Sequence, residues 1–477
     1  MPCQLPADCL NEIFEYLEKD KATLHSCLLV NRLWCEVSVR ILWRNIWIIN
    51  PIEYDYGYRL KVGTSILNTL IACLPNKSKT HLYKKGILNS TQISKIPIFN
   101  YASFCKVLSI HMIGQIIIDV FKNQKYLAKE IMKMFMENVS LKKLSYYTGS
   151  KTINLSFLRY PGAKDCLTNL SKLSCNSNIK SSFFHKLSQI CCNIQSITIE
   201  FYDTISSDLK NLISSQNNLK YLSLTRTRTH SMMDWADIIP SLTKHSNSLI
   251  KLKVHWRKYI SWDKTEQLSF ITRFTNLQEL IILFHHKDCF IGLNNKLLTI
   301  KFPQLRILKF LYEYPDDYVL TKFLENNGKN LKEFCINCSN TTPTIAEFCP
   351  NLKSLTTLFR FDKKESLKVI LNNCQQLESI ETQYYYGLLS EKEFLETLAI
   401  YSPKNFYKLK VRYGSYSQLI PEDLEGFFIN WKNRVPQRPI SFTFKGCINS
   451  LGAKEGNIGV IKKYTDLGII NKFELIK

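Results

Sequence analysis

The sequence predicts an α/β protein in which three short N-terminal helices precede a curved solenoid, with parallel strands on the concave face of the solenoid. Two observations lead to this prediction. The segment from Leu5 to Trp47 contains no glycine and carries apolar residues at helical spacing. Beyond about residue 100, short apolar strand patterns recur at spacings of 21 to 30 residues, and such a period is typical of solenoid repeats.

The N-terminal segment is predicted to fold as three helices, the first beginning near Pro6 and the second capped by Asp20. Its apolar residues recur at the i, i+3, i+4 spacing of a helix face: Leu10, Ile13, Phe14, Leu17, Leu24, Cys27, Leu28, Val39, Leu42 and Trp43. Chains of about 40 residues have marginal cores. The surplus apolar surface is therefore expected to be covered by the rest of the chain or by a partner.

This segment resembles the F-box motif. The residues that carry the resemblance are Leu5-Pro6, Ile13, Leu17, Leu28, Val30, Asn31-Arg32, Trp34 and Leu42-Trp43. One position departs from the family, because Asp8 stands where a glutamate is usual, a change that keeps a negative charge near the helix N-terminus. The alternative is an ordinary helical hairpin in a larger core.

The resemblance implies a substrate receptor of an SCF-type cullin–RING ubiquitin ligase, which docks on a Skp-type adaptor and, through it, joins the cullin complex. The adaptor-binding residues would be Leu5, Pro6, Leu10, Ile13, Leu17, Leu28, Val30 and Trp34. Such a receptor is not an enzyme itself. It holds a substrate protein close to the catalytic subunits, which raises their effective concentration.

The composition is that of a folded, soluble protein, with 45% hydrophobic and 22% charged residues in 477. No apolar run approaches the ~18 residues that span a bilayer, and no basic stretch followed by an apolar one marks a secretory signal. A cytoplasmic or nuclear location is therefore expected. The 16 cysteines are spread through apolar segments and are expected to be free thiols.

The net charge of +23 has two interpretations. It can reflect an anionic partner, such as nucleic acid, an acidic protein surface or a phosphorylated segment. It can equally reflect base composition in the gene, because the excess is rich in lysine and accompanied by many Asn and Ile residues. The densest basic run, residues 76–85, is predicted to be a solvated loop, since no aromatic platform interleaves it.

Four domains are predicted: an F-box domain at 1–47, a connecting helical region at 48–98, degenerate repeats at 99–439 and a C-terminal cap at 440–477. The connecting region contains a helix that Pro75 ends. The cap is expected to contain a helix from Lys454 to Leu467, a stop at Gly468 and a final strand from Ile469 to Ile476.

The repeats are defined by apolar anchors that begin each strand pattern, at Leu141, Leu170, Ile194, Leu219, Leu249, Leu277, Leu305, Leu331, Leu352, Leu377 and Phe406. The segments at 349–355 and 374–380 resemble the leucine-rich repeats that follow the F-box in many receptors. The polar residue expected later in such a repeat is mostly missing, so the repeats are degenerate. About ten or eleven units are expected.

No catalytic signature was found: the sequence has no P-loop, GxGxxG or GxSxG motif. Cys335 and Cys338 lie within a repeat strand, without a second pair at zinc spacing. The run from His285 to Cys289 reads as a turn after a strand. We therefore predict no cofactor, no metal and no catalytic residues.

Cys191, Cys349 and Cys374 each lie three residues before a first anchor, which predicts a buried packing role.

Two basic ladders are predicted on the concave face, since alternate residues of a strand share a face. They are Lys251, Lys253 and His255 in one repeat, and Lys408, Lys410 and Arg412 in another. They are candidates for binding an acidic or phosphorylated substrate segment. The alternative is that they are solvated lysines. At the level of the whole chain, the alternatives to a ligase receptor are a non-ligase scaffold bound to the adaptor and a basic solenoid that binds nucleic acid.

Overall fold

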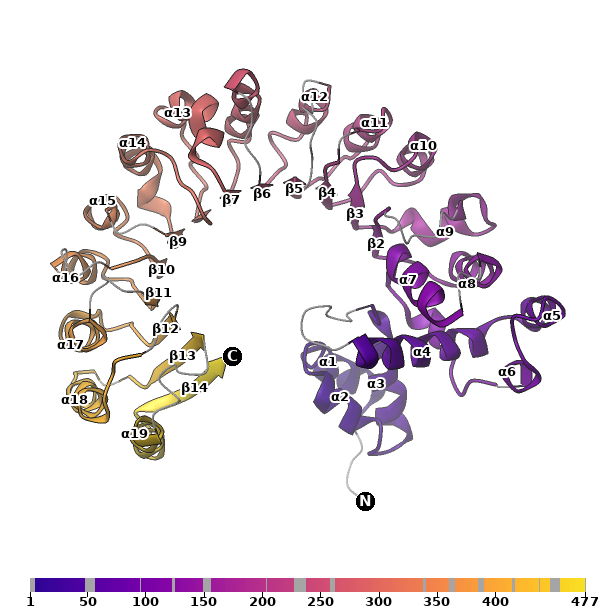
Figure 1. The fold of residues 1–477 in the computed structure, drawn as a ribbon, viewed down its shortest axis with the longest axis horizontal. Helices are drawn as coiled ribbons and strands as arrows, with labels where there is room; N and C mark the ends of the chain where they lie inside the picture. The colour runs from indigo at the N-terminus through magenta and orange to yellow at the C-terminus, as the bar shows by residue number, and fades with distance from the viewer. Residues whose placement is uncertain are drawn as a thin grey trace. The chain divides into compact units, whose positions relative to one another are not determined.

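The computed structural model describes residues 5–47, 56–94, 96–121, 125–148, 156–202, 204–226, 237–257, 262–337, 340–359, 365–384, 390–413, 417–436, 438–446 and 455–476. The chain divides into two units, Met1–Tyr221 and Leu222–Lys477. In the described residues, fourteen parallel strands follow one another in chain order, with helices between them (Figure 1). The predicted α/β solenoid after an N-terminal helical region is confirmed.

The first unit begins with three short helices, α1 (Ala7–Glu15), α2 (Lys21–Cys27) and α3 (Arg32–Arg44). Two of them have a side-chain cap. The Asp20 carboxylate accepts the Thr23 N–H at 3.0 Å, as predicted, and the Asn31 side chain accepts the Trp34 N–H at 2.9 Å. Each cap satisfies one of the donors that a helix N-terminus leaves without an intrahelical partner.

These helices share a small apolar core of their own, made by Leu10, Phe14, Leu24, Cys27, Val37 and Ile41. Leu17, Leu33, Trp34 and Leu42 pack against it, and the Phe14 and Trp34 rings meet edge to face at 5.1 Å. The core is thus closed by residues of the three helices themselves.

Three more helices follow, α4 (Tyr56–Cys73), α5 (Asn76–Lys84) and α6 (Ser90–Ser94). The predicted helix before Pro75 is confirmed as α4. The prediction of a solvated loop at 76–85 is wrong, because α5 occupies it. Pro75 has the fixed backbone angle that suits a helix start, and the buried Lys79 and Leu82, three residues apart, give α5 an inward face.

The remaining elements of the first unit alternate strands with helices. They are η1 (Tyr101–Phe104), β1 (Val107–Ser109), α7 (Ile110–Phe121), α8 (Lys125–Asn138), β2 (Lys143–Tyr146), η2 (Phe157–Arg159), α9 (Ala163–Thr168), β3 (Lys172–Asn176), α10 (Ser181–Ile190), β4 (Ser196–Glu200) and α11 (Leu209–Ser214). The N-terminal helices are joined to β1: the Lys106 N–H donates to the Arg44 carbonyl at 2.9 Å, and the Trp47 indole donates to the Val107 carbonyl at 2.6 Å.

Strand β5 (Tyr221–Arg226) lies at the division between the units. The second unit continues with α12 (Ile239–Thr243), β6 (Lys251–Trp256), η3 (Trp262–Arg273), β7 (Glu279–Phe284), η4 (Lys287–Phe290), α13 (Ile291–Leu297), β8 (Ile307–Phe310), α14 (Asp317–Asn327), η5 (Gly328–Asn330), β9 (Glu333–Ile336), α15 (Thr342–Phe348), β10 (Ser354–Thr356), α16 (Glu365–Asn373), β11 (Ser379–Tyr384), α17 (Glu391–Tyr401), β12 (Lys408–Tyr413), α18 (Pro421–Lys432), β13 (Ile440–Gly446), α19 (Glu455–Asp466) and β14 (Ile470–Ile476). Within this unit, β6–β14 line the inner side of an arc and the helices lie outside it (Figure 1). We call the exposed side of these strands the inner strand face.

The second anchors of the repeats form one buried ladder through this unit. Neighbouring strands pair in register at Leu252, Leu280, Leu308, Phe334, Leu355, Ile380 and Leu409. All of these side chains are at most 1% exposed. Each repeat therefore completes its core against the next one, as expected of a solenoid.

Strands β2–β12 coincide with the eleven predicted anchor sets. Helix α19, the left-handed Gly468 and β14 confirm the predicted elements at the C-terminus. Two strands, β1 and β13, were not predicted. Because β13 and β14 pair in parallel like the preceding strands, these two strands extend the sheet.

The recurring cysteines are buried, as predicted. The Cys191 thiol donates to the Leu167 carbonyl at 3.2 Å and the Cys374 thiol to the Cys349 carbonyl at 3.4 Å, so each bridges to the preceding repeat. Burial raises the pKa of Cys191 and that of Cys374 to about 12. These thiols are packing groups rather than nucleophiles.

Among the helices that the structure describes, none combines the length and the apolar character needed to cross a bilayer.

Candidate functional site

The N-terminal helices expose large apolar side chains although their core is closed. Leu5 is 50% exposed, Ile13 49%, Tyr16 91%, Leu29 89% and Val30 56%. We call these five residues the apolar surface. Several large apolar side chains exposed on one small domain favour a protein interaction site, because water contact with them is unfavourable.

The structure divides the predicted adaptor-binding residues into two groups. Leu5, Pro6, Ile13 and Val30 are exposed and available to a partner. Leu10 is buried in the domain's own core, and Leu17, Leu28 and Trp34 are half-buried. The second group is wholly or partly buried in the domain itself.

Tyr16 and Leu29 belong to the apolar surface but were absent from the predicted set. Both fall outside the buried helix stripes: Tyr16 follows the last residue of α1, and Leu29 lies in the turn after α2. The signal for them was a large apolar residue at a helix end, outside any core-facing stripe.

An ion pair holds the end of α3 against α1 beside this surface. The Arg44 guanidinium donates to both oxygens of Glu15, at 2.7 and 2.5 Å, and lies 3.6 Å from Glu18. The hydrogen bonds from Arg44 lower the pKa of the Glu15 carboxyl. This two-point contact fixes the relative orientation of α1 and α3.

The inner strand face of the second unit carries the predicted basic ladders. Lys251, Lys253 and His255 lie on β6, and Lys408, Lys410 and Arg412 lie on β12, with β7–β11 between them. The two sets are thus on one face of one unit but not adjacent.

Carboxylates of neighbouring strands pair with several of these cations. The Lys251 ammonium lies 2.7 Å from Glu279, and Glu381 accepts both Lys410, at 3.2 Å, and Arg412. The same arrangement recurs outside the ladders, for Lys309 on β8 with Glu333 on β9 at 2.6 Å. The inner strand face therefore carries ion pairs between neighbouring strands rather than a continuous basic surface.

A pair of histidines departs from this pattern of cross-strand ion pairs. The Nε2 atoms of His255 and His285 are 3.3 Å apart, and the Tyr312 ring stacks on His285 with centroids 3.8 Å apart. Tyr312 has a φ of 93°, an unusual conformation for a residue with a side chain. Burial, and then neighbouring cations, lower the pKa of both imidazoles. This shift disfavours the charged form of His255 and so weakens its contribution of positive charge to the ladder.

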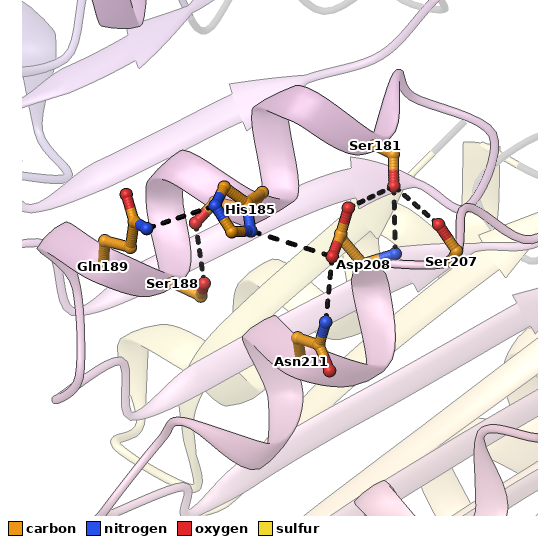
Figure 2. Close-up of polar contacts among 7 residues, drawn as sticks. All are labelled: Ser181, His185, Ser188, Gln189, Ser207, Asp208 and Asn211. Carbon is orange, nitrogen blue, oxygen red and sulfur yellow. Dashed lines mark hydrogen bonds and ion pairs between the residues drawn. The ribbon is translucent and has the colours of Figure 1, made fainter.

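A second polar cluster lies between α10 and α11 of the first unit (Figure 2). The Ser181 hydroxyl donates to Asp208 at 2.5 Å, Asn211 donates to the same carboxylate at 2.8 Å, and His185 Nδ1 is 3.8 Å from it. The hydrogen bonds from Ser181 and Asn211 lower the Asp208 pKa. Since Ser181 contacts the carboxylate and not the imidazole, the cluster lacks the hydroxyl–base contact of a nucleophile. It fastens one repeat to the next.

The residues that the structure describes contain no group of three or more His, Cys, Asp or Glu side chains placed to hold a metal. Cys335 is buried, and burial raises the pKa of its thiol. Cys338 lies outside the described residues. His285–Cys289 forms the expected turn after a strand, with η4 beginning at Lys287.

Comparison with known proteins gives one family match and several structural likenesses. The crystal structure of the Rad7 and Elc1 complex in yeast covers 94% of this chain and 94% of its own, with 12% identity and a TM-score of 0.38. A chain of the mouse RP105/MD-1 complex covers 72% of this chain and 51% of its own, with 11% identity and a TM-score of 0.29. No curated protein matches the sequence. Residues 2–49 match the F-box-like family, so the chain carries an F-box-like domain at its N-terminus.

Proposed function

We propose that this chain is the substrate-recognition subunit of an SCF-type ubiquitin ligase. In this proposal the F-box-like domain docks on a Skp-type adaptor, and the repeats, which we assign to the leucine-rich class, bind the substrate protein. The chain itself catalyses no step. It acts by holding the substrate near the catalytic subunits of a cullin complex.

The observation that carries the proposal is the apolar surface. Leu5, Ile13, Tyr16, Leu29 and Val30 are about half exposed or more, while the core beneath them is complete. Covering them with a partner removes apolar area from water at no cost to the domain's own packing. Interfaces draw most of their affinity from such apolar anchors, and aromatic residues such as Tyr16 are enriched among them.

The substrate is proposed to bind on the inner strand face around Lys253, His255 and Tyr312. Lys251, Lys410 and Arg412 already contact carboxylates, so an acidic segment would have to displace Glu279 or Glu381 to reach them. Lys253 on β6 offers a cation, and the half-exposed Tyr312, in the turn after β8, offers an aromatic plane, with β7 between the two strands. We expect an acidic or phosphorylated segment to use these side chains first.

A reconstituted ubiquitination reaction tests the proposal. Proteins captured by the full chain would be incubated with the adaptor, cullin, RING subunit and ubiquitin-conjugating enzyme, with and without this chain. The variant Ile13→Asp/Val30→Asp should abolish ubiquitin transfer by preventing docking. Ile429→Asp is the matched control, since Ile429 is 48% exposed on α18 and should leave transfer unchanged.

The outcome separates the alternatives. Transfer that depends on the chain and fails in the docking variant supports a ligase receptor. Adaptor binding by the wild type without transfer to any captured protein would instead indicate a scaffold. Equal transfer by wild type and docking variant would refute docking through the apolar surface.

A further inference from the structure

One edge of strand β14 is not covered by any strand that the structure describes. In the described part of the chain β14 pairs with β13, and no further strand follows in the sheet order. Lys472 is 64% exposed at its side chain, and Leu475 and Ile476 are 44% and 41% exposed. An open, seven-residue edge strand is a ready template for another strand.

The hydrogen-bond pattern shows which backbone groups of β14 face this edge. The Ile440 N–H of β13 donates to the Ile469 carbonyl, whereas the next residue, Ser441, donates to Tyr407 of the preceding repeat. N–H groups alternate sides along a strand, so Phe442, like Ile440, points toward β14. Its register partner is Phe473, and in a parallel ladder Phe442 bonds the residues flanking that partner, Lys472 and Glu474. The N–H and C=O of Phe473 therefore face the open edge.

The sequence of this edge is complementary to itself. If two copies pair antiparallel about Phe473, each Phe473 exchanges both backbone bonds with its counterpart. Lys472 of each copy then lies opposite Glu474 of the other copy, so the interface contains two such pairs. Opposite charges at directly facing positions stabilise an antiparallel pair, and facing side chains are close enough to interact. Within one chain Lys472 Nζ already lies 2.7 Å from Glu474 Oε1, which places both groups on one face.

The same arrangement covers apolar surface. Phe473 is half-buried against Phe444, with ring centroids 6.0 Å apart. An antiparallel pair about Phe473 has a two-fold axis perpendicular to the sheet, so the two Phe473 rings lie on the same side of the extended sheet. Each ring then covers the part of the other that its own chain leaves exposed.

We propose that two copies of this chain associate through antiparallel pairing of their β14 strands, centred on Phe473. The interface is a closed two-fold contact, in which the same residues of both copies meet. It buries one short strand on each side, well below the ~1,200–2,000 Å² of a stable interface. The dimer is therefore weak and depends on protein concentration.

A charge-exchange experiment with the full chain tests this proposal. Sedimentation or light scattering across a concentration series should approach twice the 55.7 kDa mass of one chain. Lys472→Glu places two carboxylates opposite each other, and Glu474→Lys places two ammonium groups opposite each other. Each variant alone should be monomeric. An equimolar mixture should dimerise, because every Glu of one variant then faces a Lys of the other. If Lys472 and Glu474 acted only within one chain, mixing the two variants would not restore the dimer.

A variant that removes one backbone N–H group of β14 provides a second test of the dimer. Phe473→Pro removes an N–H that β13 does not use, and proline is tolerated on an edge strand when its N–H faces solvent. It should abolish the dimer. Because it also removes the ring that packs against Phe444, its monomer should melt close to that of Phe473→Ala, which loses the same ring and keeps the N–H. A wild-type chain that stays monomeric to its solubility limit overturns the proposal. So does a dimer that survives Phe473→Pro, or an edge occupied only by a strand of a different protein.

Discussion

The F-box-like helices and the repeats of the second unit bury their apolar residues to different extents. The repeats bury their anchors almost completely, with Leu252, Leu280 and Leu308 at most 1% exposed, and their inner strand face carries cross-strand ion pairs. The helical domain closes a small core and still leaves the apolar surface in water. Exposed apolar area that no neighbouring element needs for its own core is the reason that we propose docking at the helical domain.

The difference follows from connectivity. A repeat is flanked by similar units on both sides, so each apolar face finds cover within the chain. The described contacts of the helical domain with the elements after it run along the second half of α3 and Trp47, against η1, β1 and α8. A core of about 40 residues supplies little stability by itself. The domain is thus expected to be the less stable of the two regions until a partner binds.

The largest expected effect is in the small core. Phe14→Ala should destabilise the helical domain by about 3–5 kcal/mol, enough to unfold so small a core locally. Hydrogen exchange should show loss of protection across α1–α3. Protection of β6–β14 should be unchanged, and equal loss in both regions would show that they do not fold separately.

Within the repeats, Leu280→Ala or Leu308→Ala should lower the free energy of unfolding by roughly 2–5 kcal/mol, because each removes a side chain from the buried ladder. Lys309→Ala removes only a surface ion pair with Glu333 and should cost less than about 1 kcal/mol. Denaturant titration measures both. Similar losses at Leu308 and Lys309 would mean that the assignment of inner and buried faces is wrong.

The buried carboxylate of Glu391 tests how much hydrogen bonds to a buried polar group stabilise the repeats. Glu391 accepts the Tyr413 hydroxyl at 2.6 Å, the Ser417 hydroxyl at 2.8 Å and the N–H groups of Gln418 and Leu419. Glu391→Gln replaces charge-assisted acceptors and should cost about 1–3 kcal/mol in a melting experiment. Glu396→Gln, at an exposed position of the same helix, should stay within about 0.5 kcal/mol. An unchanged melting temperature for Glu391→Gln would show that this network does not stabilise residues 417–419.

Much of the fold could be predicted from the sequence because apolar periodicity reports burial directly. The spacing from Leu141 to Phe406 located β2–β12. It missed β13, where Phe442 and Phe444 continue the sheet after the regular anchors end. It also missed α5, because lysine was read as solvated although Lys79 is buried within its helix.

The candidate site could be predicted only in part. Apolar periodicity shows which residues share a helix face, but it does not show which of them are covered by other elements. Ile13 and Leu10 share one stripe, yet Leu10 is 2% exposed and Ile13 is 49% exposed. The pairing of Lys410 and Arg412 with Glu381 depends on strand register across repeats. Spacing within one repeat does not determine that register.

The smallest expected effect concerns the histidine pair. Burial lowers the pKa of both His255 and His285 in the folded protein. The neighbouring His285, Lys253 and Arg257 lower the pKa of His255 further, and Arg257 and His286 do so for His285. The unfolded chain therefore binds more protons as the pH falls through about 6.5, and stability decreases there. Melting at pH 7.5 and pH 5 should show a smaller decrease for His255→Gln/His285→Gln than for the wild type. The exposed His25→Gln is the control, and a wild-type response in the double variant would contradict this account.

The most direct test of the central claim is the affinity of the full chain for a purified Skp-type adaptor, measured by titration calorimetry. We expect Ile13→Asp/Val30→Asp to weaken binding by about 100-fold or more, since two central apolar anchors become charged. Ile429→Asp, equally exposed on the repeats, should bind as the wild type does. If the Ile13→Asp/Val30→Asp variant remains folded and binds the adaptor with wild-type affinity, the apolar surface is not the docking site.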